Sequence, residues 1–303
     1  MRWWRWDSNR GGIVRLVSDG ARPGAVPAAH RGRRAADGVA SCRAGVCDNG
    51  QSMDAFQTDK PRRLQRLQHE VHVWLARPED VLDPAVLQQY LALLSGGECE
   101  RYRQFRFDPD RRRFLVSHAL VRRVLSAYVD VDPSSWQFSS NQHGRPEISA
   151  PAITPPLRFN LTHTTGLVAC VVSLELDCGI DVEQVSPRGN LSGIAEKMFA
   201  VSEQQALQSL DGQAFVERFF CYWTLREAYC KALGVGIAAA KKDHCFVEVE
   251  TGQWTIRFDS AAGDNGRDWQ FELTKPTADH VAAVALRVAG APAKAIIHTF
   301  VVP

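Results

Sequence analysis

One long aromatic stretch constrains the fold of this chain more than any other feature. It covers residues 219–233 and is followed by Gly234, a residue type that commonly ends helices. Most of its circumference is apolar or aromatic, so we expect a helix that is buried on several sides. Glu227 and Lys231 nevertheless share one stripe of this helix. Because buried charges are costly unless they are paired or bound, the stretch predicts either an ion pair at a half-exposed edge or a functional site.

A second charged pattern occurs earlier, in the segment Gly179-Ile180-Asp181-Val182-Glu183. Side chains two residues apart in an extended strand point to the same side, so Asp181 and Glu183 should project together. Such a pair is often only a solvated surface feature. If the segment faces the helix, however, Glu227 completes a set of hard oxygen donors of the kind that Mg²⁺ prefers.

Charge and cysteine usage limit the possible functions. Residues 1–52 contain nine Arg and four Asp, a net charge of +5. The totals of 36 basic and 34 acidic residues leave 27 and 30 for residues 53–303, a net charge of −3, which argues against nucleic acid as the ligand of the folded part. The eight cysteines include no Cys-x-x-Cys and no zinc-type spacing, so we expect a reducing, cytoplasmic location. No apolar run is long enough for a membrane span.

The first 52 residues differ from the rest of the chain. They are rich in Gly, Ala and Arg and show no sustained helical or strand periodicity. This pattern predicts a disordered basic extension, and a functional basic arm is the alternative.

The remaining sequence repeats one pattern. In each half, a long helical stretch precedes a strand, and an apolar Val/Ala strand follows a histidine, His163 in the first half and His280 in the second. The helix and strand pairs are 112–128 with 136–138, and 219–233 with 245–249. We therefore predict an α+β fold of two similar lobes, a pseudo-dimer with the active site between them. The expected lobes are residues 53–175 and 176–303.

Three sequence blocks together resemble the 4′-phosphopantetheinyl transferases of the two-lobed type. In that family's order they are Phe159-Asn160-Leu161-Thr162-His163, Gly179-Ile180-Asp181-Val182-Glu183 and Trp223-Thr224-Leu225-Arg226-Glu227-Ala228-Tyr229-Cys230-Lys231-Ala232-Leu233-Gly234. The turn Gly144-Arg145-Pro146 and the arginine-rich stretch near Arg101 also match family positions. The resemblance extends from about Val71 to Leu286 and leaves out roughly the first fifty residues.

The resemblance implies an Mg²⁺-dependent transferase. It would move the 4′-phosphopantetheine arm of coenzyme A to a serine of an apo acyl or peptidyl carrier protein and release 3′,5′-ADP. Such carriers belong to polyketide, non-ribosomal peptide or fatty-acid biosynthesis. Because one chain already supplies both lobes, we expect a monomer. The alternative is a catalytically silent module that binds coenzyme A or the carrier protein on the same fold.

The resemblance also assigns roles to individual residues. Glu227 would be the base and Lys231 would neutralise or protonate the leaving group. The metal ligands would be Asp181, Glu183 and Glu227. The residues expected to bind coenzyme A are Arg101, Arg145, Asn160, Thr162, His163 and Arg226. Within that set, His163, Arg101 and Arg145 are expected at the 3′-phosphate.

Two positions depart from the usual family pattern. Arg226 replaces a lysine, and its guanidinium differs in shape and hydrogen bonding from an ammonium. It also points about 100° away from Glu227 around a helix, so ligand or structural support is expected of it rather than chemistry. Thr162 replaces a serine but keeps the hydroxyl group.

Overall fold

The computed structural model describes residues 4–7, 12–15, 59–187, 189–237, 243–259 and 265–301. In the first 52 residues it describes only two short strands that pair antiparallel, β1 (Trp4–Asp7) and β2 (Gly12–Arg15). The prediction of a disordered extension otherwise lies outside the described residues.

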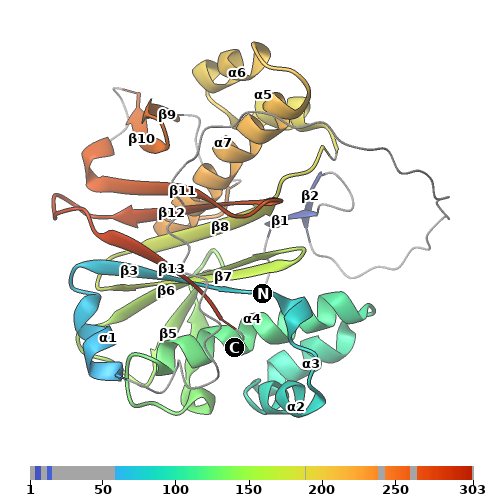
Figure 1. The fold of residues 1–303 in the computed structure, drawn as a ribbon, viewed down its shortest axis with the longest axis vertical. Coiled ribbons are helices and arrows are strands. Elements are labelled where there is room, and N and C mark those ends of the chain that lie inside the picture. Colours follow the sequence, from blue (N-terminus) through green and yellow to red (C-terminus); the bar gives the residue numbers. More distant parts are fainter. Residues whose placement is uncertain are drawn as a thin grey trace.

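Two sheets pack face to face, and a long helix covers the outer face of each (Figure 1). Helix α4 (Asp108–Ser126) covers a four-stranded sheet in the order β13-β3-β7-β6. Helix α7 (Gly212–Leu233) covers a three-stranded sheet in the order β11-β12-β8. The repetition of helix on sheet confirms the predicted α+β fold with two lobes.

The N-terminal lobe contains several smaller elements beside α4. They are α1 (Lys60–Arg66), β3 (Glu70–Ala76), α2 (Pro84–Ala92), α3 (Gly96–Gln104), β4 (Gln137–Ser140), β5 (Pro146–Ala150), β6 (Leu157–Thr164) and β7 (Leu167–Leu174). Strands β4 and β5 form a separate hairpin next to this sheet.

The C-terminal lobe begins with β8, which follows β7 after a short turn. Its elements are β8 (Cys178–Gln184), α5 (Leu191–Met198), α6 (Val201–Gln208), α7, β9 (His244–Glu250), β10 (Gln253–Phe258), β11 (Trp269–Thr277) and β12 (His280–Arg287). The last strand, β13 (Ala295–Phe300), returns to the other lobe and pairs parallel with β3. The predicted lobe of residues 176–303 is therefore wrong at its end, because β13 completes the N-terminal sheet.

The alternation of side chains along β8 decides which residues face the helix. Ile180 and Val182 lie in the apolar layer between the two sheets. Asp181 and Glu183 point the other way, toward α7, as the sequence predicted. Gly179 lies on the same side, where a Cβ atom would come within 2.1 Å of the Ala228 carbonyl oxygen. A glycine is thus needed here for the close approach of strand and helix.

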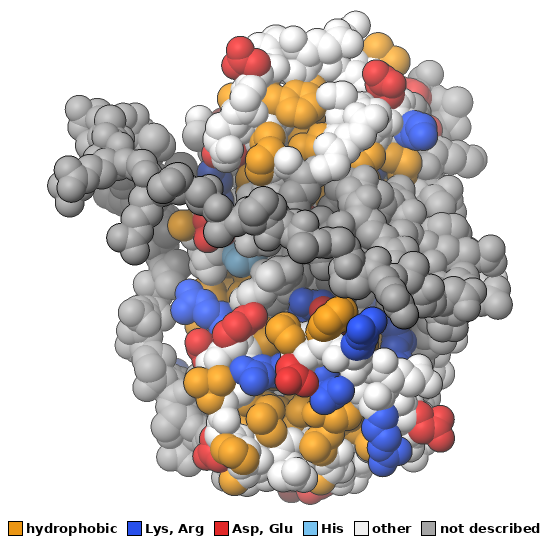
Figure 2. Space-filling model, turned by 90° about the vertical axis from the view of Figure 1, so that its right-hand side faces the viewer, with side chains coloured by type: hydrophobic (Ala, Val, Ile, Leu, Met, Phe, Trp, Pro, Cys, Tyr) orange, Lys and Arg blue, Asp and Glu red, His pale blue; other side chains and the backbone are white. Residues whose placement is uncertain are grey.

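Charged side chains of both signs are mixed on the surface of the N-terminal lobe. Figure 2 shows lysines and arginines beside aspartates and glutamates on the lower part of the face that it draws. Several arginines of the stretch 101–123 pair with carboxylates, for example Arg111 with Asp108 at 3.1 Å. The arginine-rich stretch therefore does not create a surface of one sign. None of the described helices has the length and hydrophobicity required to cross a bilayer.

Candidate active site

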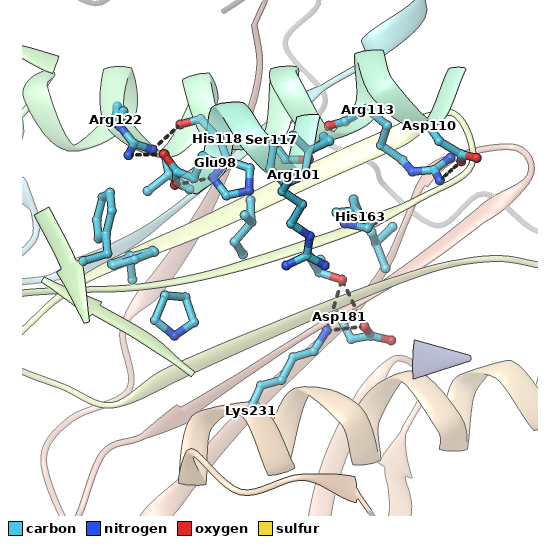
Figure 3. A pocket seen from close by; sticks show the side chains of 18 of the residues that line it. Glu98, Arg101, Asp110, Arg113, Ser117, His118, Arg122, His163, Asp181 and Lys231 are labelled. Atoms are coloured by element: carbon cyan, nitrogen blue, oxygen red, sulfur yellow. Dashed lines mark hydrogen bonds and ion pairs between the residues drawn. The ribbon is translucent and has the colours of Figure 1, made fainter. Parts of the chain in front are cut away.

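A cavity of about 300 Å³ lies between the two lobes. One wall comes from α3 and α4, and the opposite wall comes from β6, β8 and α7. Figure 3 shows Arg101 and His118 pointing into this space from the α3–α4 side, whereas Lys231 approaches from α7. Apolar side chains from both walls line much of the cavity, among them Phe114 of α4 and Phe159 of β6. The cavity thus combines apolar lining with a strongly polar end.

Lys231 organises the polar end of the cavity. Its Nζ donates to Asp181 Oδ1 at 2.6 Å and to Thr162 Oγ1 at 3.1 Å. Thr162 Oγ1 in turn donates to the same Asp181 oxygen at 3.1 Å. The three side chains come from α7, β8 and β6, so this network joins both lobes. The structure brings these three predicted site residues together.

Two further carboxylates lie at the same end. Glu183 and Glu227 line the cavity, and Glu183 Oε1 accepts a hydrogen bond from Trp223 Nε1 at 3.2 Å. Burial raises the pKa of Glu227 to about 7; Lys231 acts to lower that pKa and Asp181 to raise it. Burial, Asp181 and Glu227 raise the pKa of Glu183 well above its ordinary value. This end of the cavity therefore combines three carboxyl groups with one ammonium, and burial disfavours the charged form of Glu183 and Glu227.

The donor atoms at this end suit a hard divalent cation. Asp181 Oδ2 is buried without a hydrogen-bond partner among the described residues. Burial is the main cause of the raised pKa values of Glu183 and Glu227, and a bound cation would favour their ionised forms. In the described part of the chain, no group of three or more His, Cys, Asp or Glu side chains is arranged to hold a metal ion. At Asp181 the position of a cation is taken by Lys231 Nζ, which donates a hydrogen bond to Oδ1. The chemistry of the donor set fits a magnesium ion, and the metal stays a proposal.

Two of the predicted phosphate-binding residues line the same cavity. His163 follows Thr162 on β6. Arg101 lies in the last turn of α3, and its guanidinium is 5.8 Å from the centre of the Phe114 ring. Both are labelled in Figure 3, where they approach the polar end from the side of the N-terminal lobe.

Three residues expected to bind coenzyme A lie elsewhere. Asn160 is buried, and its Oδ1 accepts from the backbone N–H of Ile180, so it connects β6 to β8. Arg145 lies outside the cavity lining, where its Nη1 donates to the Ala232 carbonyl at 2.7 Å. Arg226 is fully buried on the opposite side of α7. For these three, the structure does not support direct contact with a ligand in the cavity.

Arg226 is held within the C-terminal lobe by two polar partners. Its Nη2 donates to Glu203 Oε2 at 2.6 Å, and its Nη1 to His244 Nε2 at 2.8 Å. The part of the prediction that assigned it structural support agrees with this environment. Its displacement from the cavity follows from the 100° step between neighbouring helix residues.

Sequence reasoning missed a polar cluster on the α4 wall. His118 Nδ1 and Arg122 Nη2 each contact a different oxygen of Glu98, both at 2.7 Å. Burial by itself would raise the pKa of Glu98, but His118 and Arg122 lower it to about 2. A signal was available: Ser95 and Glu98 form a capping box, and His118 and Arg122 are four residues apart on one helix.

Comparisons with known proteins agree with this geometry. The family model described as 4′-phosphopantetheinyl transferase, N-terminal, matches residues 83–175. The model of the 4′-phosphopantetheinyl transferase superfamily matches residues 177–285. The chain is 36% identical over 182 residues to the 4′-phosphopantetheinyl transferase HetI of Nostoc sp. (strain PCC 7120), covering 59% of this chain and 75% of that protein. The chain belongs to the 4′-phosphopantetheinyl transferase superfamily.

More distant relatives carry the same family name. The 4′-phosphopantetheinyl transferase Sfp of Bacillus subtilis (strain 168) is 28% identical over half of this chain and 65% of its own length. The L-aminoadipate-semialdehyde dehydrogenase-phosphopantetheinyl transferase of Rattus norvegicus is 25% identical over 63% of this chain and 66% of its own length. The family and enzyme class predicted from the sequence blocks are thereby confirmed.

Proposed function

We propose that this protein transfers the 4′-phosphopantetheine arm of coenzyme A to a serine of an apo acyl or peptidyl carrier protein. The observation that carries the proposal is the charged end of the interlobe cavity, where Lys231 meets Asp181 beside Glu183 and Glu227. Family membership supports the transfer to a carrier protein. The role of magnesium and the release of 3′,5′-ADP are proposed from the chemistry of these residues.

The residues at the charged end are suited to displacement at a phosphorus atom. The serine hydroxyl forms the new O–P bond at the β-phosphorus and gives its proton to Glu227. The bond from that phosphorus to the bridging oxygen breaks, and 3′,5′-ADP leaves with the electron pair. Lys231 Nζ stabilises or protonates the leaving oxygen. A base with a pKa near 7 is suited to proton removal at neutral pH.

Asp181, Glu183 and Glu227 would hold a magnesium ion, with Glu183 bound directly or through water. Such an ion spreads the negative charge of the diphosphate and helps to align it with the serine. The chain's own contribution is to exclude water with the apolar side chains that line the cavity, Phe114 and Phe159 among them, and to orient the nucleotide. His163 and Arg101 are placed to contact the 3′-phosphate from β6 and α3.

Mass spectrometry of an apo carrier protein tests the proposal. The carrier is incubated with this protein, coenzyme A and Mg²⁺, and the expected result is a mass gain of one phosphopantetheine arm. A reaction without added Mg²⁺ that contains a chelator should show no mass gain. Binding of coenzyme A without any mass gain would contradict the transferase and support the silent binding module.

A further inference from the structure

The turn between β4 and β5 belongs to the N-terminal lobe but contacts the end of α7. Asn141 Nδ2 donates to the Gly234 carbonyl at 2.9 Å, and Arg145 Nη1 donates to the Ala232 carbonyl at 2.7 Å. These contacts join residues 93 and 87 positions apart. We refer to them as the cross-lobe clamp.

The clamp completes the hydrogen bonds of a helix terminus. The last carbonyls of a helix have no partner inside it and need one from elsewhere. The carbonyls of Cys230 and Lys231 accept from the N–H groups of Val235 and Gly234 at 3.0 and 3.1 Å. The clamp supplies the donors for two further carbonyls. Arg145 also brings a positive charge to the negative end of the helix dipole.

The fit between the turn and the helix end is tight. Gly234 has a φ of +70°, and a Cβ atom there would lie 2.8 Å from Asn141 Nδ2 and 3.4 Å from Arg145 Cδ. Arg145 is buried, and its Nη2 lies 3.9 Å from Asp177 Oδ1, immediately before β8. One arginine of the N-terminal lobe therefore contacts the end of the helix that carries Lys231 and the start of the strand that carries Asp181.

We propose that Arg145 and Asn141 are positioning residues for Lys231. Ala232, which accepts from Arg145, is the residue after Lys231. With its carbonyl fixed from the N-terminal lobe, the last turn of α7 cannot fray, and the ammonium stays on Asp181 and Thr162. This inference rests on the proposed function. It assigns Arg145 a role different from the phosphate contact that the sequence predicted.

The two roles of Arg145 are separated by comparing coenzyme A with dephospho-coenzyme A, which lacks the 3′-phosphate. A positioning role predicts that Arg145→Met lowers kcat about ten- to hundredfold with both substrates, since a misplacement near 1 Å can cost this much. The ratio of kcat/KM for the two substrates should stay at the wild-type value. If instead kcat is retained and kcat/KM for coenzyme A falls toward that for dephospho-coenzyme A, Arg145 is a phosphate ligand and the inference is overturned.

Arg158→Met is the matched control. Arg158 lies on β6, lines the same small pocket as Arg145 and is only half-buried, and within the described part of the chain no hydrogen bond or ion pair joins it to α7. The control should keep the wild-type kcat. An equal loss in both variants would contradict a specific role for the clamp.

A second measurement does not depend on transfer activity. Amide hydrogen exchange at Gly234 and Val235 should become faster in Arg145→Met and remain unchanged in Arg158→Met. If the wild type transfers nothing, the proposed function fails, while exchange still tests the clamp. Unchanged exchange and unchanged kcat in folded Arg145→Met would overturn the inference.

Asn141→Asp is a second variant that tests the cross-lobe clamp if Arg145→Met does not fold. The substitution retains an oxygen for the N–H groups of His143 and Arg145, which Asn141 Oδ1 accepts at 2.9 and 3.0 Å. It replaces the donor to Gly234 by a carboxylate oxygen, which repels that carbonyl. The expected result is again a lower kcat with an unchanged substrate ratio; wild-type kcat and exchange would overturn the clamp.

Discussion

The two sides of α7 differ in how their buried charged side chains are paired. Arg226 faces the interior of the C-terminal lobe, where it is fully buried and bonded to Glu203 and His244. Glu227, the next residue, faces the cavity between the lobes. The first side chain has its charge balanced by the protein, whereas burial raises the pKa of the second to about 7.

This difference separates a structural charge from a functional one. Glu203 Oε1 also accepts from the backbone N–H of Phe246 and its Oε2 from that of Ala200, so both oxygens of this carboxylate have partners inside the lobe. On the outer side, Asp181 Oδ2 is buried without a described partner. A group that the fold leaves unsatisfied in a cavity is a candidate for ligand binding, and a satisfied one is not.

Breaking the inner cluster should have the largest effect. Arg226→Met leaves Glu203 buried without its charged partner, and such losses cost about 3–5 kcal/mol of unfolding free energy. Urea denaturation checks this value. Arg218→Met is the control, because Arg218 lies on the same helix and pairs with Glu248 at 3.0 Å with about a third of its side chain exposed. A partly exposed pair should cost no more than about 1 kcal/mol. Equal costs for both variants would contradict the comparison.

The outer side should show the opposite behaviour. Glu227→Gln should lower turnover at least about a hundredfold, equivalent to about 2.7 kcal/mol, because it removes the base and a metal ligand. Its stability at pH 8 should equal or exceed that of the wild type. The raised pKa of Glu227 means that folding disfavours its charge, so this group contributes less stability as pH rises from 4.5 through 7. Carrier mass gain and urea denaturation give the two readouts. Near-normal turnover in both Glu227→Gln and Asp181→Ala would disprove the mechanism.

Local patterns in the sequence were sufficient to predict α7 and β8. The aromatic run before Gly234 and the alternation around Asp181 depend on neighbouring residues, so periodicity reveals them. They also indicated that Asp181 and Glu183 share a side, and a resemblance between motifs related that side to Glu227 and Lys231.

Long-range packing explains what the sequence did not reveal. The partners of Arg226, Glu203 and His244, lie 23 and 18 residues away, and Arg145 donates to the end of a helix 87 residues away. Strand β13 was missed because its partner β3 lies more than two hundred residues earlier. No local pattern encodes contacts of this kind, so a family position alone did not indicate the partners of Arg145 and Arg226.

The pH dependence of stability tests the inner cluster without breaking its ion pair. Burial and the charge of Arg226 lower the pKa of His244 from 6.5 to about 4, although Asp243 acts to raise it. As pH falls below 6.5 His244 takes up a proton in the unfolded chain before it does so in the folded one, so the contribution of His244 to stability should fall between pH 6.5 and 4 and be constant above that range. His244→Gln should reduce this loss by on the order of 2 kcal/mol in denaturation curves at pH 7 and pH 4.5. An unchanged pH dependence would show that His244 is not held neutral by its surroundings.

The smallest predicted effect concerns a residue on the cavity side that is not part of α7. His163→Ala should raise the KM for coenzyme A about tenfold, the value of one lost hydrogen bond to a charged group, with little change in kcat. The variant should also discriminate less between coenzyme A and dephospho-coenzyme A, because the contact that it loses is the one to the 3′-phosphate. Arg145→Met is expected to keep that discrimination but to have a lower kcat. The two variants should therefore differ in which kinetic constant changes, KM in His163→Ala and kcat in Arg145→Met. If His163→Ala discriminates as well as the wild type, His163 does not contact the 3′-phosphate, and that group must be bound by other residues on the α3–α4 side of the cavity.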